Sequence, residues 1–152
     1  MDLNPEVKKR IDKVLKSQSI AVLGTSKDDE PYSSLVGFVM TDDLRELVFA
    51  TMRQRLKYRN MLANPRVTFM IDDRNEQNND FNETTSITIV GSAEDVKAKE
   101  REEYASLLVK RHPVLSDFVS SPDCAVIRVA IDKIFVVSDF ESVVKIGIPD
   151  YL

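Results

Sequence analysis

The sequence predicts a mainly β fold, an antiparallel barrel decorated by helices. Two observations lead to this prediction. Short apolar or alternating runs recur along the chain and are separated by tight polar turns, a pattern typical of an antiparallel meander that closes into a barrel. The order of elements also lacks the strand-helix alternation of a parallel sheet. It is a helix, three strands, a helix, two strands, a helix and a strand.

Size, composition and charge narrow the class of protein. The chain has 152 residues, 43% of them hydrophobic and 30% charged, which is typical of a single globular domain, here residues 1–152. No run approaches the roughly 20 apolar residues of a membrane span, and the first residues do not resemble a signal peptide. The net charge of −4 argues against nucleic acid as the main partner. We therefore expect a cytoplasmic protein that binds neither nucleic acid nor membranes.

An amphipathic helix and three strands open the chain. Asn4, Pro5 and Glu6 provide an N-cap, a first-position proline and an early acidic residue, and apolar residues then recur on one face until about Ser17. The strands that follow are separated by the polar turns KDDE and TDD. They span residues 19–26, 31–40 and 46–51.

A second helix and two further strands come next. The helix is expected over residues 53–63, with Tyr58, Met61 and Leu62 on its buried face, and Pro65 with its preceding asparagine stops it. The strands after it alternate between apolar and polar residues or are mostly apolar. They span residues 66–71 and 85–93.

The longest predicted helix covers residues 94–111 and packs through Tyr104, Leu107 and Leu108. The His-Pro pair that ends at Pro113 breaks it. A short helical turn and a long final strand, or a bent pair of strands, are expected over residues 114–119 and 123–138.

The polar loop at residues 72–83, DDRNEQNNDFNE, has the length and the end residues of a calcium-binding EF-hand loop. Arg74 and Gln77 occupy the positions at which that loop needs a calcium ligand and a glycine. The flanking segments are predicted to be strands, whereas helices flank an EF-hand loop. We therefore expect no calcium site here. Whether the loop covers a ligand pocket or is simply exposed stays open at this point.

A basic segment, defined here as residues 53–59, carries four positive charges and no acidic residue. Since the whole chain carries −4, the remaining residues sum to −8. The segment lies where a strand ends and a helix begins, so backbone N–H groups and the helix dipole also favour an anion there. The sequence therefore predicts a phosphate site, and a solvated basic helix face is the alternative.

Hydroxyl side chains interrupt two of the apolar strands. Ser33 and Ser34 lie in the second strand, and Ser86 and Thr88 lie in the fifth. On a barrel strand such hydroxyls can hydrogen-bond a ligand ring or a phosphate, whereas the alternative is a solvent-facing or edge position.

Residues for direct catalysis are scarce. The four glycines form neither G-x-G-x-x-G nor G-x-x-x-x-G-K-[ST], the two glycine-containing motifs that bind nucleotides. The single Cys124 and single His112 exclude a cysteine zinc cluster and a multi-histidine metal centre within one chain. We expect Cys124 to be a buried small hydrophobe and His112 to interact with a helix dipole. No Ser-His-Asp set is identifiable, so the chemistry of this protein is expected to belong to a cofactor.

Residues 50–72 resemble the pyridoxamine 5'-phosphate oxidase-like family of flavin-binding split barrels. That family has a strand ending in threonine, a short polar or basic turn, and then the pattern K-x-x-N-[LM]-x-x-N-P-x-V. The flanks, PYSSLVGF and SITIVGSAEDV, extend the resemblance to about residues 20–137. The matching residues are Thr51, Lys57, Asn60, Met61, Asn64, Pro65 and Val67.

The resemblance implies a six-stranded antiparallel split β-barrel and a homodimer with FMN at the subunit interface. It implies that Arg53, Arg55 and Lys57 hold the FMN phosphate. It further implies that residues of the second and third strands run along the flavin and that a polar residue of the fifth strand touches it. These residues are Ser34, Leu35, Val36, Gly37, Ala50, Thr51 and Ser86.

The resemblance is to the family rather than to the oxidase itself. Ser34 and Val39 stand where the oxidase has an arginine and a lysine, and the chain has no tryptophan. The leading hypothesis is an FMN-dependent oxidoreductase acting on a small molecule. A deazaflavin-dependent reductase of the same fold and a non-catalytic flavin-binding or flavin-sensing protein are the alternatives. A heme-degrading relative is expected to have more than one histidine.

Overall fold

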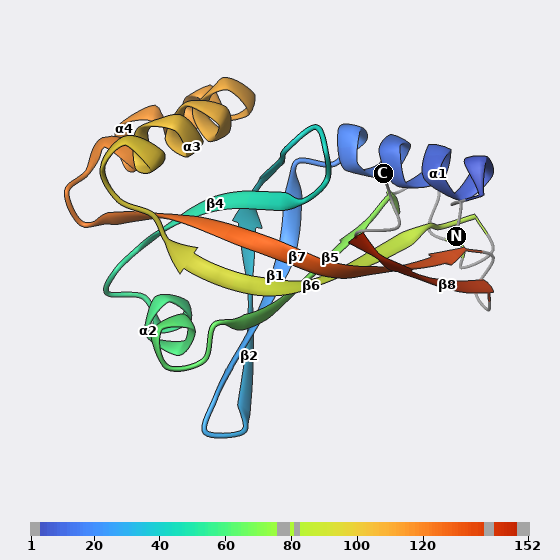
Figure 1. Ribbon diagram of the computed structural model, residues 1–152, viewed down its shortest axis with the longest axis horizontal. Helices are drawn as coiled ribbons and strands as arrows, with labels where there is room; N and C mark the ends of the chain where they lie inside the picture. The colour runs from blue at the N-terminus through green and yellow to red at the C-terminus, as the bar shows by residue number, and fades with distance from the viewer. Residues whose placement is uncertain (1–3, 76–79, 81–82, 139–141, 149–152) are drawn as a thin grey trace.

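The computed structural model describes residues 4–75, 80, 83–138 and 142–148. Within these ranges, eight strands form one curled antiparallel sheet and the helices pack at its ends (Figure 1). The mainly β class and the antiparallel barrel-like sheet are therefore confirmed. The strands are β1 Ile20–Lys27, β2 Glu30–Gly37, β3 Val39–Met40, β4 Glu46–Met52, β5 Arg66–Asp72, β6 Ser86–Asp95, β7 Cys124–Ser138 and β8 Ser142–Gly147. The helices are α1 Pro5–Ser17, α2 Leu56–Ala63, α3 Ala98–Arg111, the 3-10 turn η1 Pro113–Leu115 and α4 Ser116–Ser120.

The sheet has the order β2-β1-β5-β6-β7-β4-β3, and β8 pairs with β7 beside this path. The expected count of six strands is too low. The expected strand at residues 31–40 divides into β2 and β3 at Phe38, whose backbone N–H donates to the Ser19 carbonyl and whose side chain is fully buried. Strand β8 was not expected, and its edge position leaves most of its residues exposed.

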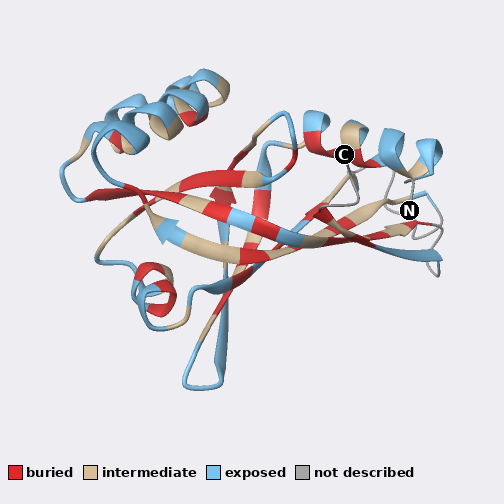
Figure 2. Cartoon of the chain, in the orientation of Figure 1, coloured by how far each residue is buried: buried red, intermediate tan, exposed pale blue. Residues whose placement is uncertain are grey.

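Two apolar clusters form the core. The larger fills the inside of the curled sheet, where α1 covers it, and contains the edge-to-face pair Phe49 and Phe69 with ring centroids 5.6 Å apart. The smaller lies between the strands and the helices α3 and α4, and includes Val48, Leu108 and Val126. Figure 2 shows that the outer sides of α3 and α4 are largely exposed, so these helices bury one side only.

Several predicted boundaries differ from the structure. Helix α2 begins at Leu56 and not at residue 53, because backbone hydrogen bonds hold the intervening residues in a turn. Helix α3 begins at Ala98 because the residues before it continue β6 in its pairing with β7. Leu62 is 66% exposed and Leu107 is 37% exposed, so both were wrongly placed on a packing face. On α2, Asn60 is buried where Leu62 was expected to be, and its side-chain N–H donates a hydrogen bond to Thr25 Oγ1.

Local signals at the start of the chain were interpreted correctly. The Asn4 side chain accepts a hydrogen bond from the Glu6 N–H at 2.9 Å, as an N-cap does. Asp28 and Asp29, between β1 and β2, both have positive φ, the backbone conformation that closes a two-residue hairpin. Among the described residues, no helix is long and apolar enough to cross a membrane.

Candidate functional site

A pocket of about 360 Å³ lies where strands β2 and β4 meet the start of α2 and the segment η1-α4. The strand side and the η1-α4 side are lined mainly by apolar side chains, with Tyr32 and Thr51 as polar exceptions, and the start of α2 is basic. The lining residues are Tyr32, Leu35, Val36, Gly37, Ala50, Thr51, Met52, Arg55, Leu56, Lys57, Leu115 and Phe118. An elongated ligand with an apolar body and an anionic end would match this distribution of side chains.

The basic end of the pocket is formed by Arg55 and Lys57. In the described part of the chain, no hydrogen bond or ion pair engages either side chain. Burial, and secondly the nearby charge of Arg55, lower the pKa of Lys57 from its ordinary 10.5. Two cations that repel each other at the edge of a pocket, without a carboxylate between them, favour a bound anion.

The backbone adds to this positive potential. Helix α2 starts beside the pocket, no side chain caps its N-terminus, and its first turn contains no acidic residue. The uncapped N–H groups and the helix dipole therefore favour negative charge at the same place as Arg55 and Lys57. This arrangement follows from the local sequence, in which β4 runs directly into the basic segment.

Arg53, the third expected phosphate ligand, does not line the pocket. Its Nη1 donates to the Pro122 carbonyl at 3.0 Å, and its Nη2 lies 3.4 Å from Asp95 Oδ2. Tyr58 donates to the same carboxylate at 2.7 Å. Burial, the largest influence, acts to raise the pKa of Asp95, but hydrogen bonds from Tyr58 and Lys97 and the nearby positive charges together lower that pKa below 3.8. Arg53 is thus committed to an ion pair outside the pocket.

Most of the expected strand residues are brought together. Leu35, Val36, Gly37, Ala50 and Thr51 all line the pocket.

Ser34 lies on the same side of β2 as Tyr32 and Val36, between these two lining residues. Its Oγ is buried and has no hydrogen-bond partner among the described residues. A buried hydroxyl without a partner is costly in a protein interior, so a ligand atom that reached it would relieve that cost.

Ser86 is separated from the pocket of its own chain. It pairs with Val137 near one end of β7, whereas Thr51 pairs with Ala125 near the other end. The structure therefore does not bring Ser86 to the other expected site residues within one chain.

Four apolar residues of the pocket were not predicted as site residues: Met52, Leu56, Leu115 and Phe118. Met52 directly precedes the basic segment in the sequence, and Leu56 lies within it. Leu115 and Phe118 belong to the short turn predicted after the longest helix, but nothing in their spacing linked them to a site. Leu115 and Phe118 reach the pocket because η1 and α4 lead the chain from His112, which contacts Phe38, to Cys124, which pairs with Met52 at the end of β4. Tyr32 was likewise missed, since an exposed aromatic residue on a hairpin strand carries no specific signal.

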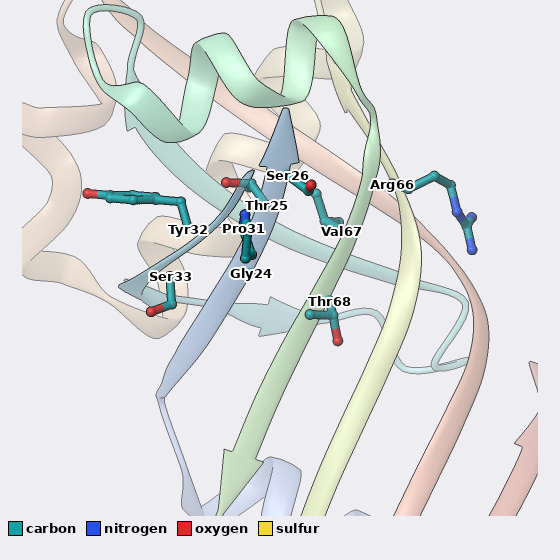
Figure 3. Close-up of a pocket in the computed structure, with 9 residues that line it drawn as sticks. All are labelled: Gly24, Thr25, Ser26, Pro31, Tyr32, Ser33, Arg66, Val67 and Thr68. Atoms are coloured by element: carbon teal, nitrogen blue, oxygen red, sulfur yellow. The ribbon is translucent and has the colours of Figure 1, made fainter. Parts of the chain in front are cut away.

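A second hollow, of about 540 Å³, lies between the β1-β2 hairpin and β5 (Figure 3). Its one basic residue, Arg66, hydrogen-bonds Ser92 at 2.8 Å and pairs with Asp132. Figure 3 shows the Arg66 side chain extending away from Tyr32 and Ser33. The described lining of this hollow therefore offers an anion no uncommitted cation, in contrast to the pocket beside α2.

His112 and Cys124 have structural environments. His112 Nε2 lies 2.8 Å from the Phe38 carbonyl oxygen, and the imidazole packs against Gly37. Since a carbonyl only accepts, this ring nitrogen carries the proton. Cys124 is fully buried, as expected, and burial raises the pKa of its thiol. No group of three or more potential metal-binding residues is found in the described ranges.

Comparison with known proteins identifies a family for the chain and solved structures that share its fold. A model of the family described as pyridoxamine 5'-phosphate oxidase matches residues 7–138. No curated protein matches the chain. Solved structures with the same split-barrel fold include a heme binding protein from Mycobacterium smegmatis, with a TM-score of 0.85, 15% identity and coverage of 98% of this chain and 61% of that one.

Two further solved structures share the fold. One is the heme storage protein from Vibrio cholerae, with a TM-score of 0.74, 18% identity and coverage of 90% of this chain and 95% of the other. The other is an FAD-binding protein from Mesorhizobium loti, with a TM-score of 0.69, 20% identity and coverage of 84% and 90%. At these identities the similarity shows the fold alone. The chain spans less than two thirds of the mycobacterial protein.

Proposed function

The chain belongs to the pyridoxamine 5'-phosphate oxidase family, and we propose that it binds FMN in the pocket beside α2. The observation that carries the proposal is the pair of uncommitted cations, Arg55 and Lys57, at one end of a pocket whose other walls are mainly apolar side chains. A phosphate on an aromatic ring system matches both ends at once.

The residues present fit FMN. Arg55, Lys57 and the uncapped start of α2 would hold the phosphate. Val36 and Gly37 of β2 and Ala50 and Thr51 of β4 would lie along the flavin ring. The buried Ser34 Oγ would gain a hydrogen-bond partner from the ligand. Bound FMN supplies hydride transfer, for which the protein provides binding and orientation.

We assign the chain as a flavin-dependent oxidoreductase acting on a small molecule. The described pocket lining contains no aspartate, glutamate or histidine, which supports a reaction whose chemistry belongs to the cofactor. A deazaflavin coenzyme, which also carries phosphate, is the alternative ligand of the same basic end. A flavin-binding protein without a reaction of its own would use the same residues.

Heme is the other ligand class suggested by the structural relatives. The one histidine of the chain is His112. Its Nε2 is engaged by the Phe38 carbonyl at 2.8 Å, so this nitrogen is not available to an iron atom without breaking that bond. The pocket beside α2 thus fits a flavin phosphate better than a histidine-ligated heme.

The absorbance spectrum of the purified protein tests the cofactor directly. We expect the two visible bands of an oxidised flavin, and mass spectrometry of the molecule released by heating should give FMN. A single deazaflavin band would change the cofactor and keep the site. A colourless protein that also fails to bind added FMN would contradict the flavin proposal.

We further propose a homodimer formed through the outer face of the sheet. Leu35, Val22 and Met70 lie side by side across β2, β1 and β5, and Leu35 and Met70 are 69% and 47% exposed. Leu35 also lines the pocket, so a second copy covering this row would close the pocket edge. Ser86 is separated from the pocket of its own chain, so in such a dimer the flavin it would contact is the one bound to the second copy.

Substituting Met70 by lysine should dissociate this dimer, because a charge would be buried among apolar side chains. Sedimentation is expected to give a dimer for the wild type and a monomer for Met70→Lys. Leu62→Lys is the matched control, since Leu62 is also exposed but lies on α2. A wild-type monomer of 17 kDa with flavin bound would contradict the shared site.

A further inference from the structure

A carboxylate from a distant part of the chain contacts two side chains of the basic segment. Asp95 ends β6, and its side chain is only 10% exposed. Its Oδ2 accepts a hydrogen bond from Tyr58 Oη at 2.7 Å and lies 3.4 Å from Arg53 Nη2. In the sequence, Arg53 precedes and Tyr58 follows the two cations that line the pocket. Asp95 therefore binds the basic segment on both sides of these cations.

The same carboxylate has no direct part in the pocket. Asp95 is not among the lining residues, and its other oxygen, Oδ1, is buried without a hydrogen-bond partner among the described residues. The contacts of Oδ2 also include Lys97 Nζ at 3.0 Å. All the observed polar contacts of this side chain therefore hold neighbouring protein groups.

The segment needs such an anchor for an electrostatic reason. Arg55 and Lys57 carry like charges close enough for Arg55 to disfavour the charged form of Lys57. Without a ligand, this repulsion acts to spread the two side chains and to loosen the turn that carries them. Anchoring Arg53 and Tyr58 to a single, nearly buried anion opposes that movement and keeps both cations at the pocket.

We propose that Asp95 is a positioning residue of the phosphate site: by holding Arg53 and Tyr58 it keeps Arg55 and Lys57 converging on the ligand. The inference rests on the proposed FMN site and extends it to a residue that does not touch the ligand. It also gives Arg53 a role, since this arginine serves the site through Asp95 and not through the phosphate.

The test compares FMN with riboflavin, which has the same ring system without the phosphate. Asp95→Asn keeps the shape of the side chain and removes its charge. We expect FMN to bind about tenfold more weakly to this variant, the effect of losing charge-assisted hydrogen bonds, and riboflavin affinity to stay within about twofold of the wild type. Glu94→Gln is the matched control, because Glu94 is adjacent, 57% exposed and paired with Arg128. It should change neither affinity.

Tyr58→Phe provides a second variant that retains the aromatic ring of a core residue and removes only the hydroxyl. It should lower the ratio of FMN to riboflavin affinity in the same direction and to a smaller extent. A loss of both affinities in parallel with a lower melting temperature would assign Asp95 a purely structural role and overturn the proposal. Unchanged FMN affinity in a folded Asp95→Asn would also overturn it, while leaving the FMN site intact. A wild type that binds neither flavin would remove the proposed function and the role of Asp95 with it.

Discussion

Replacing Lys57 by alanine is expected to weaken FMN binding by about 1.5–3 kcal/mol, the contribution of a charge-assisted contact to phosphate. Arg55→Ala should have an effect of the same size, because both side chains line the basic end of the pocket and neither has another described partner. Fluorescence titration with FMN measures the change. The apo protein should not lose stability, since removing either cation relieves the electrostatic repulsion between Arg55 and Lys57.

Riboflavin and a neighbouring arginine provide the controls for this prediction. Riboflavin affinity should hardly change in either variant, because the lost interaction is with the phosphate. Arg59→Ala removes an exposed charge from the same helix without touching the pocket, so FMN affinity should be retained. Equal affinity of the wild type, Lys57→Ala and Arg55→Ala for FMN would show that the phosphate binds elsewhere.

The lowered pKa of Lys57 gives the same site a pH dependence. As the pH rises toward 10.5, Lys57 loses its proton earlier than an exposed lysine does, so FMN affinity should begin to fall below pH 10.5. Lys57→Arg keeps the charge throughout this range because of the higher pKa of arginine. Its FMN affinity should therefore stay constant where that of the wild type declines.

Gly91→Ala is expected to destabilise the fold by about 3 kcal/mol or more, the upper range for overpacking a tight site. Gly91 lies at the irregularity where β6 changes register against β7. A Cβ atom there would lie 2.8 Å from Val129 Cγ1 and closer still to the Ala130 carbonyl oxygen. Because the backbone of the central strand cannot move aside as a side chain can, the pairing of β6 with β7 has to distort. Urea unfolding measures the loss.

Two other glycines provide a graded comparison. At Gly24 a Cβ would lie 2.7 Å from Thr68 Cγ2, a side-chain atom that can shift, so Gly24→Ala should cost about 1–3 kcal/mol. At Gly37 the nearest atom is His112 Cε1 at 3.4 Å, a tolerable contact, so the change should stay within about 1 kcal/mol. If Gly91→Ala were as stable as Gly37→Ala, the close approach of β6 to β7 would be wrong.

The order and type of most elements could be predicted from the sequence, because their signals are local. The N-cap at Asn4, the two aspartates of the first hairpin and the proline that ends α2 each act within a few residues. The division of the second strand at Phe38 could not be predicted in this way. It depends on a backbone hydrogen bond to Ser19 and on burial among residues that are distant in the sequence.

For the candidate site, local sequence was enough to predict a basic segment that follows a strand and opens a helix, together with the family pattern at Lys57, Asn60 and Pro65. Which cations of this segment line the pocket depends on contacts between distant parts of the chain. Arg53 and Arg55 have the same chemistry and are two residues apart, yet Arg53 pairs with Asp95, 42 residues further along the chain, and Arg55 lines the pocket. The physical reason is that charge and helix propensity are properties of a residue and its neighbours. The counter-ion that commits a side chain, and the apolar wall formed by Leu115 and Phe118, exist only once the sheet has brought distant strands and helices together.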